Sequence, residues 1–466
     1  MQRARIVLAA LLVASLALLP VLGPSAMAAP QKAAGQASKG FTISFTEHKL
    51  KNGLHVILSE DHSAPTYSIA VAYFAGSRDE RQGRTGFAHL FEHMMFQGSE
   101  NVGRGEHSYL VSNNGGGLNG TTNNDRTLYF ETMPANQLDL GLFLEADRMR
   151  ALAVNQFNLD NQRSVVQEER RLGLDNQPYG KTYEAVDATA YDNFAYKHSV
   201  IGSMEDLSAA TLQDVQDFFR TYYAPNNAVV VLVGDFSSKD ALAKVEKYFG
   251  SIPSQIPPTK PDMTEPEQKA ERRVALDDAL ARAPRLDIAY KIPQAGTPDW
   301  FALNVAGRIL SSGQSSRFYQ KLVKEKEMAT SAFGGAGERA GPSTFRIGVM
   351  IRPGKTFEEV EKLVYDEIDR LANEPVSDEE LGKVRMMMRR QQASSLQGTL
   401  NRAAQLADYM AVEGDPNLIN TYQDKFNSVT KADIQRVART YLKATNRTVI
   451  TTTPKPQAPG AARPGL

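Results

Sequence analysis

Short apolar runs and longer stretches of helical periodicity alternate along this chain. In the first half, runs rich in β-branched and aromatic residues predict strands at Ile43–Leu50, His55–Ser59, Ser68–Phe74, Gly115–Thr122, Thr127–Glu131 and Val229–Val233. Lys51-Asn52-Gly53 separates the first two runs, and an Asn-Gly pair in that place predicts a hairpin turn. Apolar positions three and four apart predict helices over residues 135–152, 159–174 and 239–249.

Residues 251–270 interrupt this pattern with five prolines among polar residues, which predicts a stiff linker. Beyond the linker, strands are predicted at Leu286–Ile292, Phe345–Ile351 and Thr448–Thr453, and helices over residues 300–310, 357–406 and 430–441. From Pro454 onwards proline, glycine and alanine dominate, which predicts a disordered tail.

The most apolar predicted helix, Gly86–Phe96, carries His89, Glu92 and His93. On a helix the two histidines lie one turn apart on one face, so they could share one Zn²⁺ with a carboxylate beside them. Ionisable groups within an apolar helix are costly unless a metal or another partner satisfies them. The alternative is two core histidines beside a surface glutamate.

A catalytic zinc needs a third protein ligand, and the predicted helix Gln162–Leu172 offers two candidates. Glu169 falls near the centre of the apolar stripe of this helix, and Glu168 lies towards its edge. The run Glu168–Arg171 also fits a solvated charged surface, so helical geometry leaves both interpretations open. The remaining histidines have no partner at helical spacing and are expected to be ordinary surface or loop residues: His48, His55, His62, His107 and His198.

The second half of the chain repeats the first at a fixed offset of 219 residues. Seven residues of the block Thr211–Asn227 recur in the block Thr430–Asn446 at identical spacing, and each block is a helix leading into a strand. The same offset carries the three motif residues to Arg308, Ser311 and Ser312. The second copy is therefore expected to keep the fold without the metal residues, and a site is expected in a cleft between the copies.

The start of the chain predicts export. Arg3 and Arg5 precede an apolar run from Ile6 to Leu22, and Ala26-Met27-Ala28 follows, which is the pattern of a secretory signal cleaved after Ala28. The apolar run approaches the lower length limit for a membrane span, so a retained anchor is the alternative. We expect an exported protein, with the periplasm as its compartment and no membrane span after signal cleavage.

Composition excludes several other classes of protein. The chain has no cysteine, so disulfides, a lipid-modified cysteine and cysteine metal sites are excluded. Lys+Arg and Asp+Glu balance at 53 each, which gives no electrostatic argument for nucleic acid or an anionic membrane surface.

The motif His89-x-x-Glu92-His93, with Glu169 downstream, resembles the inverzincin zinc metallopeptidases, the family of pitrilysin, insulin-degrading enzyme and the mitochondrial processing peptidase. The resemblance covers nearly the whole chain after the signal. It extends to Gly76–Glu80, Asn119–Thr122, Asn226–Ala228 and Gly234-Asp235. The size resembles that of the shorter members, whose active unit is made by two chains.

The resemblance implies an α+β fold of two duplicated domains, each an antiparallel sheet packed with helices, that form half of a clamshell around a closed chamber. The expected boundaries are a signal peptide at 1–28, a flexible leader at 29–40, a zinc-binding catalytic peptidase domain at 41–250, a linker at 251–275, a metal-free domain at 276–453 and a tail at 454–466.

The resemblance also implies the chemistry. One Zn²⁺ per chain would be held by His89, His93 and Glu169, and Glu92 would take a proton from the attacking water and pass it to the leaving amine. Peptides or small unfolded proteins would lie along Asn119, Gly120, Thr121 and Thr122 by β-augmentation, through backbone hydrogen bonds that are largely blind to sequence.

The sequence departs from the family's pattern in two features. The family commonly has a second glutamate seven residues before the glutamate ligand, and that position is Gln162 here, which alters the support behind the ligands. An Arg and a Tyr that relatives contribute from the second half correspond to Val323 and Thr330, although Arg317 or Tyr319 could in principle substitute.

The missing Arg/Tyr pair predicts a heteromer, in which a second family chain that carries the pair closes over this one. One alternative is a non-catalytic peptide-binding or assembly subunit of the same family. Another is a zinc amidase that acts on a different small substrate, because the metal chemistry alone does not select peptides.

Overall fold

The structure is a computed structural model that describes residues 42–455 of the 466. The predicted signal peptide, the leader and the tail beyond Lys455 lie outside the described residues. None of the helices within the described range is both long enough and apolar enough to cross a membrane.

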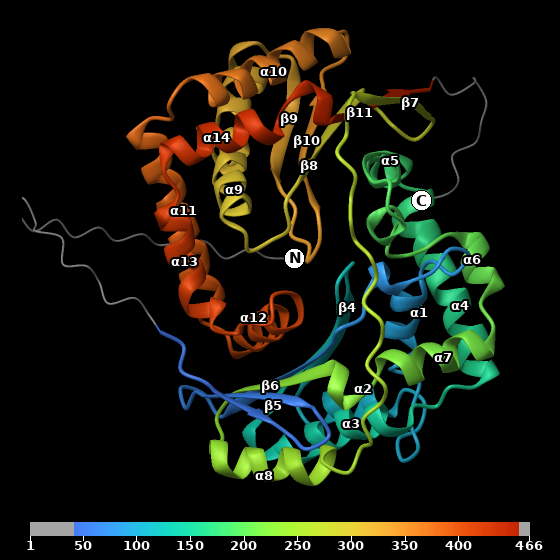
Figure 1. Ribbon diagram of the computed structural model, residues 1–466. Helices are drawn as coiled ribbons and strands as arrows, with labels where there is room; N and C mark the ends of the chain where they lie inside the picture. The colour runs from blue at the N-terminus through green and yellow to red at the C-terminus, as the bar shows by residue number, and fades with distance from the viewer. Residues whose placement is uncertain (1–41, 456–466) are drawn as a thin grey trace, which may run out of the picture. The chain divides into compact units, whose positions relative to one another are not determined.

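Two sheets organise the described chain (Figure 1). The first is built from β1 (Thr46–Lys49), β2 (His55–Glu60), β3 (Thr66–Tyr73), β4 (Gly117–Thr122), β5 (Thr127–Pro134) and β6 (Ala228–Gly234). The second is built from β7 (Arg272–Asp278), β8 (Arg285–Ile292), β9 (Ala329–Ala336), β10 (Ser343–Ile351) and β11 (Arg447–Pro454). We call residues 42–250 the first half and residues 271–455 the second half.

The α-helices surround these sheets. Those of the first half are α1 (Phe87–Met94), α2 (Glu106–Asn113), α3 (Leu138–Ala151), α4 (Gln156–Arg170), α5 (Gly180–Ala190), α6 (Met204–Ala209), α7 (Leu212–Tyr222) and α8 (Ser238–Phe249). Those of the second half are α9 (Pro298–Ser311), α10 (Phe357–Asn373), α11 (Asp378–Ser395), α12 (Thr399–Val412), α13 (Leu418–Ser428) and α14 (Lys431–Tyr441).

Both sheets are antiparallel except for one strand pair each. The strand orders are β1-β2-β6-β3-β5-β4 and β7-β11-β8-β10-β9. β2 pairs in parallel with β6, and β7 pairs in parallel with β11. A parallel pair needs a long crossover, and most of each half lies between the two strands of its pair. The expected α+β fold is confirmed, with the correction that each sheet is dominated by antiparallel pairs rather than purely antiparallel.

The predicted repeat is visible in matching contacts. Thr211 and Asp214 form a capping box at the start of α7, and Thr430 and Asp433 form the same box at the start of α14. The amide of Asn227 donates to the carbonyl of Tyr222 at 2.9 Å. The amide of Asn446 donates to the carbonyl of Tyr441 at 2.7 Å, again 219 residues later.

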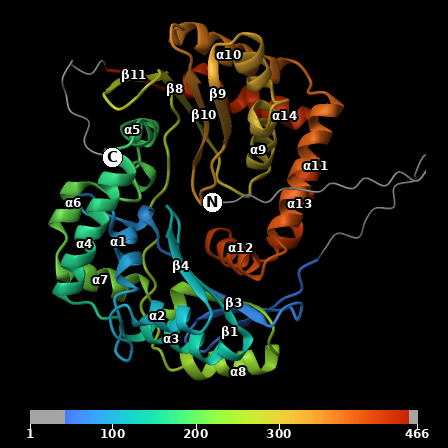
Figure 2. The same ribbon diagram turned by 180° about the vertical axis from the view of Figure 1, so that it is seen from behind.

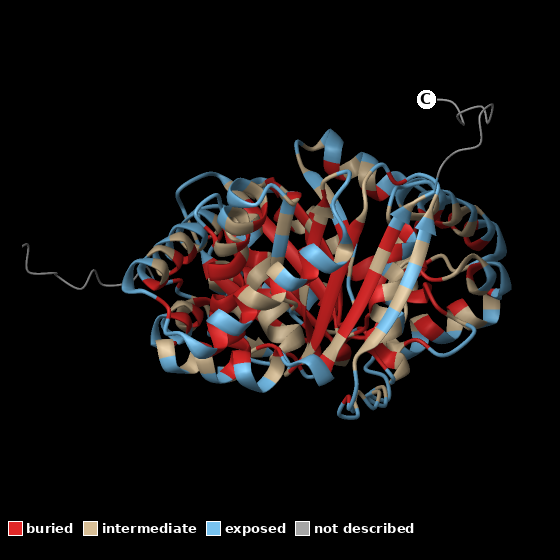
Figure 3. Ribbon diagram, turned by 90° about the horizontal axis from the view of Figure 1, so that it is seen from above, coloured by how far each residue is buried: buried red, intermediate tan, exposed pale blue. Residues whose placement is uncertain are grey.

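Each sheet is covered on one face by a helix from the other half. α12 lies over the first sheet (Figure 2), where it packs on β3 and β6. Leu406 and Ala403 of α12 join the same apolar cluster as Val231 of β6. α5 packs on β8 and β11 of the second sheet, where Val186 lies with Ile450. Burial follows this arrangement, because the strands between the helix layers are largely buried and the outer helix faces are exposed (Figure 3). The predicted domain boundaries stay predictions.

Several elements differ from the sequence expectations. Residues 251–270 form no regular element, and β7, β9, α2 and α13 had not been predicted. The helices predicted over 357–406 are α10, α11 and the start of α12, and Pro375 and Gly398 lie in the breaks between them. The predicted helix over 159–174 ends as α4 at Arg170 and continues as a π-helical segment, Arg171–Asp175.

Candidate active site

Helix α1 carries the histidine motif, and its start is held by a buried carboxylate. Gly86 precedes the helix with a left-handed φ of 85°, where a Cβ would lie 2.6 Å from the carbonyl oxygen of Ile201. Glu80 accepts hydrogen bonds from the backbone N–H of Gly86 at 2.9 Å and of Ala88 at 2.8 Å. A carboxylate at a helix N-terminus satisfies free N–H groups and favours the helix dipole.

Glu80 is itself paired with His198. Nδ1 of His198 lies 3.0 Å from the carbonyl oxygen of Phe194, and Nε2 lies 3.0 Å from both Glu80 Oε2 and the carbonyl oxygen of Ser77. Because these neighbours can only accept, both ring nitrogens must donate, so the ring is protonated here. Burial opposes this charge, but the Glu80 carboxylate and the two carbonyls outweigh burial and raise the pKa of His198 above 6.5.

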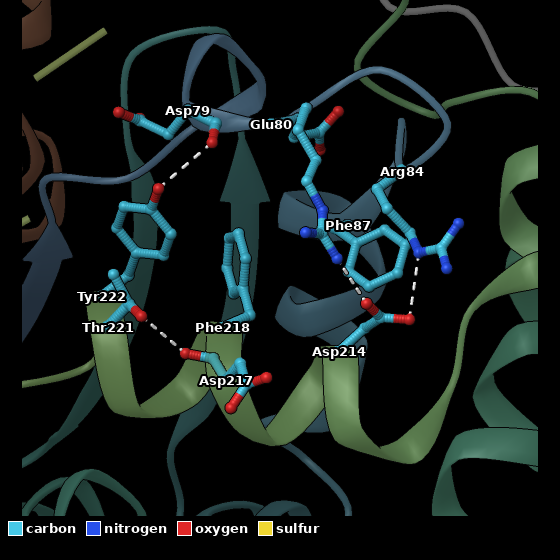
Figure 4. A pocket seen from close by; sticks show the side chains of 10 residues that line it. Asp79, Glu80, Arg84, Phe87, Asp214, Asp217, Phe218, Thr221 and Tyr222 are labelled. Carbon is cyan, nitrogen blue, oxygen red and sulfur yellow. Dashed lines mark hydrogen bonds and ion pairs between the residues drawn. The ribbon is translucent and has the colours of Figure 1, made fainter. Parts of the chain in front are cut away.

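The far side of α1 is closed by α7. Phe87 and Phe218 line a cavity of about 320 Å³ there, and Asp214 on α7 accepts from Arg81 at 2.7 Å and Arg84 at 3.0 Å (Figure 4). The motif histidines do not line this cavity. These contacts hold α1 from behind and leave its histidine face for other partners.

On that face the structure brings His89 and His93 to Glu169 of α4. Glu169 Oε2 lies 3.8 Å from Nε2 of His89 and 3.3 Å from Nε2 of His93, and the two imidazole rings are 4.8 Å apart. Ligands of a tetrahedral zinc at about 2.0–2.1 Å lie about 3.3 Å from one another, so this donor set fits Zn²⁺. Burial, followed by the charge of His93, lowers the pKa of His89 to about 4, which keeps its ring nitrogens free to bind.

Glu168 points elsewhere. Its carboxylate pairs with Arg171 at 2.9 Å, and its side chain is 56% exposed. Arg170, on the other side of Glu169, donates to Glu184 at 2.7 Å and to the carbonyl oxygen of Gly202 at 2.6 Å. The end of α4 is therefore anchored one residue after Glu169, which directs this carboxylate towards α1.

Glu92, between the two histidines, contacts strand β4. The hydroxyl of Thr122 donates to Glu92 Oε2 at 2.5 Å. A Cβ at Gly120 would lie 3.0 Å from Glu92 Cγ and 3.1 Å from Oε1, so the carboxylate rests against a residue without a side chain. Burial raises the pKa of Glu92, and the bond from Thr122 and the charge of His93 oppose the rise.

β4 is the outer strand of the first sheet, paired only with β5. The N–H of Gly120 donates to the side chain of its neighbour Asn119 at 2.9 Å rather than to β5. Asn119 and Thr121 are exposed, whereas Gly120 is buried and Thr122 half-buried, so alternate residues face α1. An extended peptide could add to this free edge beside Glu92.

The positions that depart from the family's pattern are also placed. Gln162 is buried, and its amide donates to Asn161 at 2.7 Å. Val323 lies in a π-helical segment, and Thr330 is an exposed residue of β9. Arg317 donates two hydrogen bonds to Glu380, at 2.7 and 3.2 Å, so its guanidinium is already engaged.

Sequence reasoning missed another cluster of ionisable residues in the first half, and this one is fully buried. His107 of α2 contacts Glu131 of β5, and Arg148 of α3 donates to both oxygens of Glu145. Burial raises the pKa of both glutamates to about 7 and lowers the pKa of His107 to about 3. His107, Glu131 and Glu145 offer ligand atoms that lie within 4.8 Å of one another. The i,i+3 spacing of Glu145 and Arg148 in a predicted helix was the available signal.

His107 is buried in α2, so the expectation of a surface or loop residue is wrong for it. His198 does lie in a loop, but its side chain is only 11% exposed, and both histidines pair with carboxylates. The partners are distant in sequence, 24 and 118 residues away, so helical spacing could not reveal them. His62 does lie at the surface, where it pairs with Asp235 at 2.7 Å.

Comparisons with known proteins agree with this geometry. The profile "Insulinase (Peptidase family M16)" matches residues 55–203, and "Peptidase M16 inactive domain" matches residues 209–388. Zinc protease PqqE of Helicobacter pylori is 32% identical over 405 residues, which cover 86% of this chain and 91% of that protein. The mitochondrial-processing peptidase β subunit of Lentinula edodes is 23% identical over 414 residues, which cover 85% of this chain and 88% of that protein.

Solved structures give the same picture. The crystal structure of a protease from Helicobacter pylori superimposes with a TM-score of 0.85 at 30% identity, over 89% of this chain and all of that one. The first half of the periplasmic protease PqqL from Escherichia coli superimposes with a TM-score of 0.72 at 17% identity, over 89% of this chain and 93% of that one. This chain belongs to peptidase family M16, whose members include zinc proteases, pitrilysin-type enzymes and the mitochondrial processing peptidase.

Proposed function

We propose that this chain is an exported zinc endopeptidase that hydrolyses peptides or small unfolded proteins within a closed chamber. The observation that carries the proposal is the convergence of His89, His93 and Glu169 beside a carboxylate, Glu92, that touches a free strand edge. The two histidines and Glu169 would hold one Zn²⁺. When bound, Zn²⁺ supplies Lewis-acid polarisation of a carbonyl and lowers the pKa of water.

The remaining roles fall to the chain's own residues. Glu92 accepts the proton of the attacking water and returns it to the leaving amine. The free edge of β4, from Asn119 to Thr122, binds the substrate backbone. The side-chain hydroxyl of Thr122 donates to Glu92 and orients its carboxylate.

The first test separates metal binding from catalysis. Glu169→Gln should lower the zinc content of the purified chain sharply, and Glu168→Gln is the matched control that should retain zinc. Glu92→Gln should keep zinc and lose hydrolysis, because a positioned base typically contributes about 10²–10⁴ in rate. Equal zinc in both neighbouring variants, or full turnover in Glu92→Gln, would contradict these assignments.

We further propose that the active form is a heteromer with a second family chain that supplies an Arg/Tyr pair. The side chain of Val323 has no hydrogen-bond donor, and the hydroxyl of Thr330 lies 3.4 Å from the carbonyl oxygen of Met350. Arg317, one of the two alternatives that the sequence offered beside Tyr319, is held by Glu380. Donors placed where charge develops on a carbonyl are each worth about 10²–10³ in rate, so a chain without them is expected to be slow.

Mixing experiments test the heteromer. Hydrolysis should be strong only when this chain and the partner are combined. A homogeneous, zinc-loaded preparation of this chain that cleaves peptides as fast as any mixture would refute the partner. If the mixture binds peptides without cleaving them, the chain is instead a non-catalytic binding or assembly subunit, which the match to the inactive-domain profile keeps as the second candidate.

A further inference from the structure

The tip of the β4–β5 hairpin contacts the second half of the chain. Asp125, in this tip, accepts from Arg78 at 2.6 Å, from the hydroxyl of Tyr196 at 2.7 Å and from the N–H of Ala340 at 3.1 Å. Ala340 lies in the loop between β9 and β10. The neighbouring residue, Arg126, donates through Nε to Asp408 of α12 at 2.5 Å.

Arg126 also donates hydrogen bonds to the edge strand β4. Its Nη1 donates to the carbonyl oxygen of Thr121 at 2.9 Å and to the hydroxyl of Thr121 at 2.8 Å. The side chain of Arg126 is 11% exposed, so its charge is largely removed from water and depends on the carboxylate of Asp408. A planar guanidinium that bonds to both groups holds them in one geometry.

The other end of this connection is rigid. α12 is anchored on the first sheet by Ala403, Leu406 and Ala407, which are all fully buried, so Asp408 has a fixed place above the hairpin. β4 is one of the two edge strands of its sheet, with pairing on one side only, so it is less constrained than the inner strands. A fixed anchor beside a loosely held strand can decide where the strand lies.

We infer that Asp408 of the metal-free half, acting through Arg126, is a positioning residue for the peptide substrate. The inference rests on the proposed function, because it assigns the free edge of β4 to substrate binding. Asp408 and Arg126 hold Thr121, so that Gly120 and Thr122 on either side present the edge at a defined distance from Glu92. When β4 is already held in place, a peptide can bind to it without the entropic cost of ordering the strand. The metal-free half thereby contributes to substrate affinity without touching the substrate.

The test compares Asp408→Asn with Asp408→Glu, which keeps the charge, and with Asp366→Asn, a control on the exposed face of α10. Asp408→Asn should raise KM for an unstructured fluorescence-quenched peptide about three- to tenfold, which lies in the lower part of the range of coupling between contacting residues. Zinc content should not change, and kcat should stay within about twofold, because neither the ligands nor Glu92 is altered. Asp408→Glu should restore most of the affinity, and Asp366→Asn should behave as wild type.

Hydrogen exchange gives a readout that needs neither substrate nor partner. Amides of residues 117–128 should exchange faster in Asp408→Asn than in wild type, and the combination with Arg126→Met should be no worse than Arg126→Met alone. Wild-type exchange together with wild-type KM in Asp408→Asn would overturn the inference. A wild-type chain that cleaves peptide neither alone nor with its partner, together with faster β4 exchange in Asp408→Asn, would instead refute the proposed function and leave the Asp408–Arg126 connection in place.

Discussion

The contact between Thr122 and Glu92 gives the sharpest test of how the candidate site works. Thr122→Val keeps the β-branched shape of the side chain and its place in β4, and it removes the hydroxyl that donates to Glu92 Oε2 at 2.5 Å. The hydroxyl has one other neighbour, Thr127 Oγ1, at a distance of 3.4 Å that contributes little. The substitution therefore acts mainly on the orientation of the proposed general base.

The size of the effect follows from the type of bond. A hydrogen bond to a charged group contributes about 1.5–3 kcal/mol, and 1.36 kcal/mol corresponds to about tenfold in rate. If this bond holds Glu92 ready for proton transfer, kcat should fall about ten- to a hundredfold. The loss should be smaller than for removal of the carboxylate itself, since Glu92 still rests against Gly120.

Steady-state kinetics on zinc-loaded protein would measure the effect. We expect lower kcat with KM and zinc content close to wild type, and recovery of most of the rate in Thr122→Ser, which restores the hydroxyl. A valine variant with kcat within about twofold of wild type would refute the reasoning, because the bond would then contribute less than about 0.5 kcal/mol to the barrier. Loss of zinc in the valine variant would show that Thr122 supports the ligands instead.

Three further predictions concern the same region. Gly120→Ala should lower kcat because the added Cβ would lie too close to Glu92. Gly117→Ala, with no heavy atom within 4 Å of the added Cβ, should retain activity. Measuring kcat for both variants under the same conditions tests whether they differ. Glu80→Ala should lower the free energy of unfolding by about 3–5 kcal/mol in urea titrations, because it leaves the charged ring of His198 and two backbone N–H groups at the start of α1 without their carboxylate partner. A loss below about 1 kcal/mol would contradict the role of Glu80 in holding the start of α1. The folded-state pKa of His198 is raised above 6.5, so its stabilising contribution is complete below pH 6.5 and is lost as pH rises through the folded pKa. Over that pH window the free energy of unfolding of the wild type should fall more steeply than that of His198→Gln. Parallel curves of stability against pH would contradict the protonated ring.

Much of the fold could be predicted from the sequence, since the apolar pattern is strong where a strand is buried on both faces. β6 is buried at every position, and β3 at all but its first, and both were predicted from apolar runs. β9 was missed because Ala329–Ala336 is rich in small residues and mostly unburied. Periodicity identifies the apolar face of a helix but not its partner, so the packing of α5 and α12 on the opposite sheets could not be foreseen.

The candidate site could also be predicted only in part from the sequence. Helical spacing joined His89 to His93, but it left Glu168 and Glu169 open, and the structure separates them through the pairing of Glu168 with Arg171. The partners of Glu92 and Glu80 lie 30 and 118 residues away in sequence, and such contacts depend on how the chain folds back. Their roles in binding zinc and in catalysis stay predictions until the variants above are measured.

The exchange of covering helices has a consequence for the order in which the chain can fold. The face of the first sheet that α12 covers, with Ile57 and Val231, is buried by residues more than 150 positions further along, and Ser68 meets Thr399 across a separation of 331 residues. Closing such long loops is slow, and it cannot occur before α12 has emerged from the ribosome. Until then an apolar sheet face stands open to aggregation. A fragment that ends at residue 250 should therefore be poorly soluble on its own, and adding residues 399–412 as a separate peptide should protect it.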